Sequence, residues 1–197
     1  MILPDWTLKS LMYSGAIDVA PIEDIQIQSA SIDLRLDDSF LEIEGNTSEK
    51  IRGGFTFMDV PVIDLDEEVK YKEHTLPYIG PNQFLLGTTV ETVKLPADIG
   101  AIVCGRSSIG RAGLCVENAG WIDPGFEGKI TLELQNIAPH AIKKPIGKRV
   151  CQIIFIGLSG KCEKPYGCEE IGSKYQGQDN VTGSKIHMDG ELNDKQD

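Results

Sequence analysis

The chain has 197 residues, of which 41% are hydrophobic and 25% are charged, and its formal net charge is −11 at pH 7. This length is sufficient to bury the core of one domain. The acidic balance argues against a nucleic acid as partner, because binding a long polyanion requires Lys and Arg side chains that neutralise phosphates. A small phosphorylated ligand remains compatible with this charge, because one local arginine cluster is enough to bind it.

The amino terminus and the cysteines indicate the compartment. No apolar run approaches the roughly 18 residues that span a bilayer, and no basic region precedes an apolar segment at the start of the chain. The five cysteines form no Cys-x-x-Cys pair, which indicates reduced thiols. We therefore expect a soluble, cytoplasmic protein with no membrane partner, and we expect most of its cysteines to be buried. They are Cys104, Cys115, Cys151, Cys162 and Cys168.

One short helix is predicted at the amino terminus. Leu8, Leu11 and Met12 recur at helical spacing and form an apolar stripe for the core. The helix lies between Asp5 and Gly15, and the glycine is suited to a left-handed cap.

A strand follows at residues 31–36, where apolar and polar side chains alternate. Its charged members, Asp33 and Arg35, are predicted to face solvent. The apolar face of the strand is formed by Ile32, Leu34 and Leu36.

The acidic run at residues 64–68 has no clear period and is predicted to be an exposed loop rather than a metal site.

Further short strands, separated by Gly and Pro turns, predict a mainly β protein with a barrel or jelly-roll arrangement. They are expected at residues 83–93, 100–104, 129–136 and 149–157. From residue 169 the chain becomes polar and rich in glycine, and such a composition cannot hold a core. We therefore divide the chain into a β domain at 1–168 and a segment at 169–197, which is either a disordered tail or a mobile arm that closes over a ligand.

One segment combines glycine, serine and arginine in a way that suits phosphate. Glycines let the backbone approach closely, hydroxyl and N–H groups donate to oxygens, and arginine pairs bidentately with a phosphoryl group. An ordinary surface turn explains such a composition equally well. The segment reads Gly105-Arg106-Ser107-Ser108-Ile109-Gly110-Arg111-Ala112-Gly113.

A second segment joins a turn to a strand that carries a carboxylate. Asp123-Pro124-Gly125 favours a turn, because Pro fixes φ and Gly accepts a positive φ. In the strand that follows, alternation places Thr131, Glu133 and Gln135 on one face. A carboxylate there most often faces solvent, but in a shielded pocket its proton affinity would rise and it could move protons.

These segments resemble the dCTP deaminase family, relatives of the homotrimeric dUTPases. The resemblance rests on GRSSIGRAGL followed by AGWIDPGFEGKITLEL, with ASIDLRL upstream and GSKYQGQ downstream, and it extends to about Asp189. It implies a distorted β-barrel or jelly-roll of the dUTPase-like fold, with a short amino-terminal helix and a mobile carboxy-terminal arm. It also implies a homotrimer that acts on dCTP and on dUTP.

The resemblance further implies a role for each matching residue. Glu133 would be the general base that activates a water, and Asp123 would contact the deoxyribose and assist catalysis. Ser107 and Arg111 would shape the reaction centre. The nucleotide would be bound by Arg106, Ser107, Ser108, Ile109, Gly110, Arg111, Asp123, Thr131, Leu132, Glu133, Gln152, Tyr166, Lys174 and Gln178.

The implied reaction needs no zinc, and the chain lacks the signature of the zinc deaminases. Those enzymes need His-x-Glu and Pro-Cys-x-x-Cys, whereas His74, His140 and His187 are not followed by Glu at that spacing. Magnesium is expected to accompany the triphosphate, without metal-ligating residues of its own.

The pair Gly120-Trp121 favours one subdivision of the family. Members that only deaminate have His-Arg before Ile-Asp, whereas dUMP-forming members have Gly with an aromatic residue, as this chain does. The chain would then deaminate dCTP and hydrolyse the bound product to dUMP and diphosphate, supplying dUMP for thymidylate synthesis. The alternatives are a deaminase that releases dUTP, a plain dUTPase, and a nucleotide sensor without catalysis.

Overall fold

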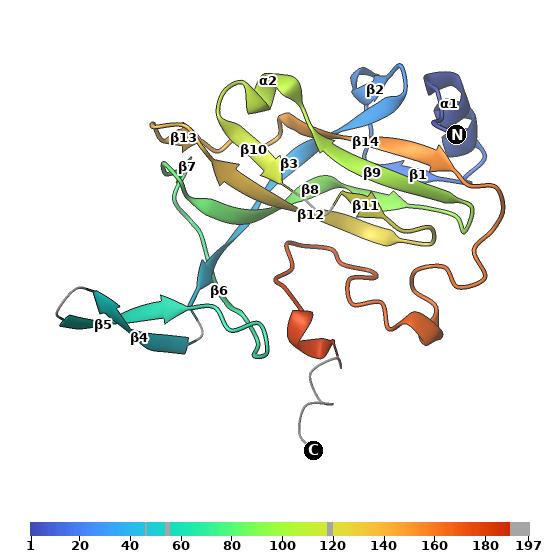
Figure 1. The fold of residues 1–197 in the computed structure, drawn as a ribbon. Helices are drawn as coiled ribbons and strands as arrows, with labels where there is room; N and C mark the ends of the chain where they lie inside the picture. Colours follow the sequence, from blue (N-terminus) through green and yellow to red (C-terminus); the bar gives the residue numbers. More distant parts are fainter. Residues whose placement is uncertain (46, 54–55, 118–119, 190–197) are drawn as a thin grey trace.

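The structure is a computed structural model that describes residues 1–45, 47–53, 56–117 and 120–189. Within these residues one antiparallel sheet of ten strands curls around the core (Figure 1). The strands follow the order β10-β12-β8-β3-β14-β9-β11, with β1 paired to β8 and both β2 and β6 paired to β3. Since β10 also contacts β9, the two ends of the sheet approach each other and form a distorted barrel.

The bounds of the sheet strands agree with the alternation of side chains in the sequence. All four strands predicted at residues 83–157 are present. The strand predicted at residues 31–36 is also present, and it extends further, to Glu44. The ten strands in this part of the chain are β1 (Asp18–Ala20), β2 (Ile27–Gln28), β3 (Ser31–Glu44), β6 (Lys70–Glu73), β8 (Phe84–Lys94), β9 (Ile99–Gly105), β10 (Leu114–Glu117), β11 (Trp121–Ile122), β12 (Glu127–Asn136) and β14 (Arg149–Gly157).

Smaller elements lie around this sheet. Strand β7 (Tyr78–Ile79) pairs with β13 (Ile142–Lys143), and β4 (Thr47–Gly53) pairs with β5 (Thr56–Val62) in a hairpin that stands apart from the sheet (Figure 1). The helical elements are α1 (Asp5–Tyr13), α2 (Ser107–Gly110) and the 3-10 turns η1 (Asp24–Gln26), η2 (Glu169–Ile171) and η3 (Ile186–Met188). No helix in the described ranges is long and apolar enough to cross a membrane.

The predicted amino-terminal helix is confirmed. Leu8 of α1 is fully buried, while Leu11 and Met12 pack against the core. The helix ends before Gly15, whose φ of 73° is the left-handed conformation that glycine adopts without strain.

The prediction that Asp33 and Arg35 face solvent is wrong. Asp33 is 1% exposed and forms ion pairs with Arg106 and Arg149. Arg35 pairs through Nε with Glu91, which is fully buried, at 2.6 Å. Buried carboxylates need cationic partners, and Arg35, Arg106 and Arg149 provide them here.

Two further expectations have opposite outcomes. The expectation that most cysteines are buried is wrong, and the expectation that the acidic run forms an exposed loop is confirmed. Only Cys151 among the five cysteines is buried, and the other four are half-buried free thiols. Residues 65–68 are exposed, in a turn between β5 and β6.

Candidate active site

Strand β12 separates the core from a cavity of about 670 Å³. Its buried side chains Ile130, Leu132 and Leu134 alternate with Thr131 and Glu133, which line the cavity. Leu132 has its side chain in the core, so only its backbone is available to a ligand. The alternation predicted from sequence is thus confirmed, and it places a carboxylate on a rigid element.

Glu133 is held in an environment that favours its protonated form. Its Oε2 atom is buried and has no hydrogen-bond partner among the described residues. Burial raises the pKa of Glu133 above its ordinary value; a backbone hydrogen bond opposes this, and the nearby charge of Glu117 adds to it. A carboxylate with a raised proton affinity can accept a proton and return it during a reaction.

The Asp-Pro-Gly turn brings a second carboxylate to the same cavity. The N–H of Phe126 donates to the carbonyl of Asp123 at 3.2 Å, and Gly125 has a φ of 92°, as the turn requires. The exposed Asp123 side chain lines the cavity and accepts a hydrogen bond of 2.7 Å from Nε1 of Trp121. The indole therefore holds the carboxylate in position.

Residues 169–189 run along β12, and several of them form the opposite wall of the cavity (Figure 1). Gln178 donates from Nε2 to the carbonyl of Lys129 at 2.5 Å, and its own carbonyl accepts from the N–H of Lys129 at 2.8 Å. The N–H of Thr182 donates to Oγ1 of Thr131 at 3.2 Å. These hydrogen bonds pack residues 169–189 against the β domain.

Tyr166 and Lys174 also line this cavity. The hydroxyl of Tyr166 accepts a hydrogen bond of 3.0 Å from the N–H of Tyr175. The Lys174 ammonium contacts both carboxylate oxygens of Asp189 at 2.7 Å. The cavity thus combines cationic, amide, hydroxyl and carboxylate groups with the aromatic rings of its walls.

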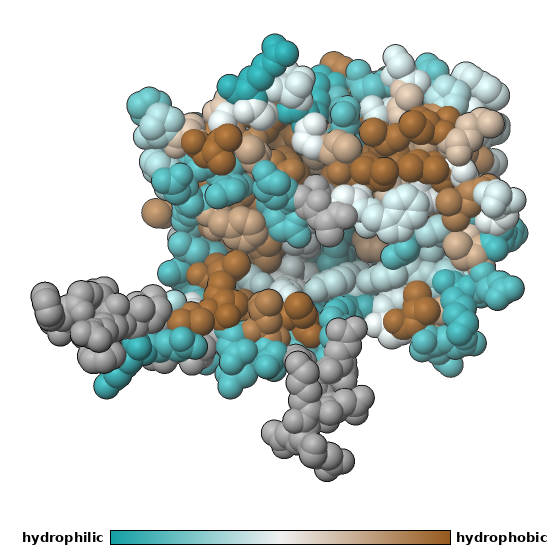
Figure 2. All heavy atoms as spheres, viewed as in Figure 1, coloured by the Kyte–Doolittle hydropathy of each residue, from teal (hydrophilic) through white to brown (hydrophobic). Residues whose placement is uncertain are grey.

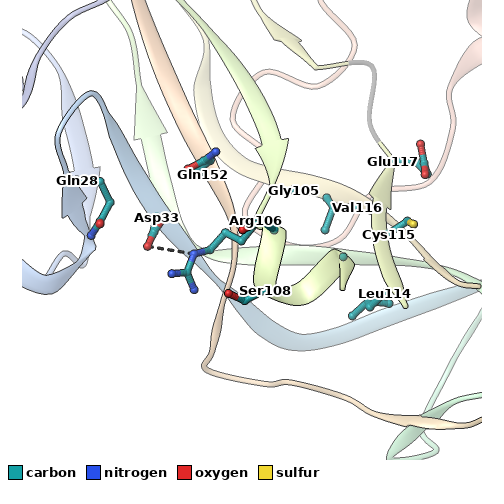
Figure 3. A pocket seen from close by; sticks show the side chains of 12 residues that line it. Gln28, Asp33, Gly105, Arg106, Ser108, Leu114, Cys115, Val116, Glu117 and Gln152 are labelled. Carbon is teal, nitrogen blue, oxygen red and sulfur yellow. Dashed lines mark ion pairs between the residues drawn. The ribbon is translucent and has the colours of Figure 1, made fainter. Parts of the chain in front are cut away.

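The glycine-serine-arginine segment lines a different cavity, of about 520 Å³ (Figure 3). Arg106 ends the extended stretch after β9, and residues 107–110 form the single turn α2. Ser107 and Ser108 are exposed, while Gln152 reaches the same cavity from β14. Nε of Arg106 lies 3.2 Å from a carboxylate oxygen of Asp33.

The predicted site residues therefore divide between two cavities that share no lining residue. One holds Asp123, Thr131, Glu133, Tyr166, Lys174 and Gln178, and the other holds Arg106, Ser107, Ser108, Gly110 and Gln152. Arg111 caps α2 and is exposed, and Ile109 packs against the core and lines a third cavity.

Sequence reasoning missed several lining residues. Tyr71, Phe84 and Leu86 line the Glu133 cavity from β6 and β8, far away in the chain. The pairing of β8 with β12 brings Phe84 and Leu86 there, the pairing of β6 with β3 holds the strand that carries Tyr71, and no local motif marks any of them. Asp33 lies in a segment that the sequence singled out, but its burial depends on distant arginines.

Magnesium fits this donor set only as a companion of phosphate. No three His, Cys, Asp or Glu side chains converge as metal ligands in the described ranges. Magnesium commonly retains waters and takes one or two carboxylates in addition to substrate phosphates. The exposed carboxylate of Asp123 fits that requirement.

Comparison with known proteins first defines the fold. A crystal structure of 2'-deoxycytidine 5'-triphosphate deaminase from Agrobacterium tumefaciens superposes with a TM-score of 0.55 at 23% identity, over 78% of this chain and 47% of that chain. This likeness concerns the fold, and it agrees with the predicted class of mainly β protein.

The family follows from the sequence. The profile of the dCTP deaminase-like family matches residues 2–158. The proteins named "dCTP deaminase, dUMP-forming" from Sulfurihydrogenibium sp. and from Aquifex aeolicus are each 41% identical to this chain, over 96% and 98% of it and 99% and 98% of their own lengths. The protein of that name from Dictyoglomus turgidum is 43% identical, over 96% of both chains. The chain belongs to the dCTP deaminase-like family.

Proposed function

We propose that the protein deaminates dCTP and hydrolyses the bound product to dUMP and diphosphate. The observation that carries this proposal is the Glu133 carboxylate on β12, which faces the cavity with one oxygen buried and unpartnered among the described residues. The names of the full-length relatives agree with both steps of the reaction.

In the deamination step, Glu133 acts as the general base. It takes a proton from a water that attacks C4 of the cytosine ring, and the C4–N bond then breaks. The proton passes to the departing nitrogen, so that dCTP and water give dUTP and ammonia. The raised pKa of Glu133 suits both halves of this transfer.

The remaining residues of the Glu133 cavity position the nucleoside. Thr131 lies on the same face of β12 and meets the base, and Asp123 receives the deoxyribose. Tyr166, Lys174 and Gln178 close the cavity from the arm. Burial of the nucleoside excludes bulk water and leaves the attacking water under the control of Glu133.

In the second step the dUTP stays bound, and a second water attacks the α-phosphorus to release diphosphate. Asp123, held by Trp121, is placed to assist. When bound with the nucleotide, magnesium would be held by the phosphates and Asp123 and would neutralise phosphate charge. The alternatives are a deaminase that releases dUTP, and a plain dUTPase, which would have no use for a base at Glu133.

The complete site requires a second copy of the chain in a homotrimer. Arg106, Ser107, Ser108 and Gly110 line a cavity that shares no lining residue with the Glu133 cavity, so we assign this phosphate-binding group to the site of a neighbouring subunit. An apolar band over β9 and β14 supports this association (Figure 2). Half-buried Ile102 and Ile154 lie opposite each other there, where an antiparallel strand pair facing water would carry polar side chains.

Product analysis tests the proposal. Incubation with dCTP and magnesium is expected to yield equal amounts of ammonia, dUMP and diphosphate, without accumulation of dUTP. Ammonia with dUTP and no diphosphate would contradict the second step, and diphosphate from dUTP without ammonia from dCTP would indicate a dUTPase. Binding without any product would indicate a nucleotide sensor.

For an enzyme that acts on dCTP we also propose the cytoplasm as the compartment.

A further inference from the structure

We propose that Asp33 is a positioning residue, whose buried carboxylate orients the Arg106 guanidinium toward the triphosphate. This inference rests on the proposed function, because it concerns the same nucleotide. In this proposal Asp33 does not touch the substrate and acts only through Arg106.

The first observation is the burial of Asp33 in the wall of the phosphate-side cavity. Its side chain is 2% exposed, and it lies on β3 directly opposite Gln152 on β14. Both residues line that cavity (Figure 3). A buried carboxylate is costly unless cations and hydrogen bonds compensate it, so Asp33 requires partners at this place.

The second observation is the way in which two arginines share this carboxylate. Nε of Arg106 and Nη1 of Arg149 approach the same oxygen, Oδ2, at 3.2 and 3.0 Å. Nη1 of Arg106 also donates to the carbonyl of Arg149 at 3.0 Å. These contacts hold two of the three guanidinium nitrogens, and among the described residues Nη2 has no partner.

The consequence is a preorganised cation beside Ser107 and Ser108. One carboxylate shared by two guanidinium groups leaves the group of Asp33, Arg106 and Arg149 with a net positive charge. A free arginine side chain loses rotamer entropy when it binds phosphate, and a side chain that is already held loses less. Asp33 should therefore increase affinity for the triphosphate while leaving the reaction at the base unaffected.

Glu91 provides a matched control. It is also fully buried, and it also binds an arginine Nε, that of Arg35, at 2.6 Å. It lines neither of the two cavities that hold the proposed site residues. Neutralising Glu91 therefore disrupts a comparable buried ion pair whose carboxylate makes no direct contact with Arg106.

The experiment compares Asp33→Asn, Glu91→Gln and Arg106→Met in steady-state turnover of dCTP. Asp33→Asn should raise KM about tenfold, because Arg106 loses the ion pair that orients it, with a much smaller change in kcat. Glu91→Gln should lower the unfolding temperature but leave KM within about twofold of the parent, because the Glu91 carboxylate does not contact Arg106 directly. On the Arg106→Met background, Asp33→Asn should cause no further rise in KM.

Binding in the non-turnover variant Glu133→Gln provides a second readout, which does not depend on catalysis. Asp33→Asn should weaken dCTP binding and leave deoxycytidine binding unchanged. An unchanged KM in Asp33→Asn, an equal rise in Glu91→Gln, or a full further rise on the Arg106→Met background would each overturn the inference. If Asp33→Asn does not fold, Arg106→Lys replaces it, and an unchanged KM there overturns the inference as well. Lack of turnover by the parent protein would instead contradict the proposed function.

Discussion

Glu117 of β10 lies directly opposite Glu133 of β12 in the antiparallel pairing of these strands. Side chains that are directly opposite extend from the same face, so the two carboxylates are neighbours. Glu133 lines its own cavity, and Glu117 lines the cavity of the glycine-serine-arginine segment. Like charges at such positions repel each other, and protonation of one carboxylate relieves the repulsion. The pair therefore favours a proton on the more buried member, Glu133.

The pH dependence of deamination should report this pair. Below its pKa Glu133 is protonated and cannot act as a base, so kcat/KM should fall as the pH decreases. Glu117→Gln removes the repulsion, lowers the pKa of Glu133 and moves the acid limb to lower pH. At acidic pH the variant should be about two- to threefold faster than the parent, as expected for one cross-strand like-charge pair.

The control is Glu127→Gln, which removes a carboxylate from β12, the strand that carries Glu133. This variant should leave the acid limb of the pH profile of kcat/KM in place. The other titratable side chains that line the cavity are unchanged in both variants, so a difference between the variants reports Glu117. Identical acid limbs in Glu117→Gln and the parent would contradict the coupling. Those other side chains are Tyr71, Asp123, Tyr166, Lys174, Tyr175 and Asp189.

Gly100→Ala tests whether Trp121 positions Asp123. A Cβ at Gly100 would lie 2.5 Å from Cη2 and 2.7 Å from Cζ2 of the indole, so the ring must move and its hydrogen bond to Asp123 must change. Release of diphosphate should become about tenfold slower than release of ammonia, because a small displacement costs much in such a step. Gly160→Ala, where a Cβ meets no atom within 4 Å, should behave as the parent. Equal loss of both products in Gly100→Ala would contradict the assigned role.

A chain that ends at Cys168 tests the proposed division into domain and arm. None of the residues 169–189 is buried, so the truncated protein should still unfold cooperatively at a similar temperature. Loss of one wall of the Glu133 cavity should raise KM for dCTP about tenfold or more. A protein that fails to fold, as measured by circular dichroism, would show that the arm belongs to the β domain. An unchanged KM would show that the arm does not serve the nucleotide.

How much could be predicted from sequence depended on whether a feature is local. The alternation of β12 and the Asp123 turn are local patterns, and both were confirmed in the structure. The burial of Asp33 was not predicted, because it depends on Arg106 and Arg149, which only the sheet brings together. Composition alone could not decide between a tail and an arm, because the bonds of Gln178 and Thr182 to β12 are tertiary contacts.

Mixing two inactive variants tests whether the site is shared between subunits. Glu133→Gln damages one cavity and Arg111→Ala damages the proposed phosphate-binding segment. In a cyclic trimer each site would combine two subunits, so random mixing at equal amounts should restore about a quarter of the parent activity. Ammonia release measured after co-refolding checks this result. A mixture as inactive as its components would place both groups in the same subunit's site.

The most direct test of the central claim is ammonia release from dCTP by Glu133→Gln, with dCTP binding measured by calorimetry in the same sample. The amide cannot accept a proton, so release should fall at least about a thousandfold while the dissociation constant for dCTP changes little. Deamination at the parent rate by a variant that binds dCTP normally would contradict the assignment of Glu133 as the base.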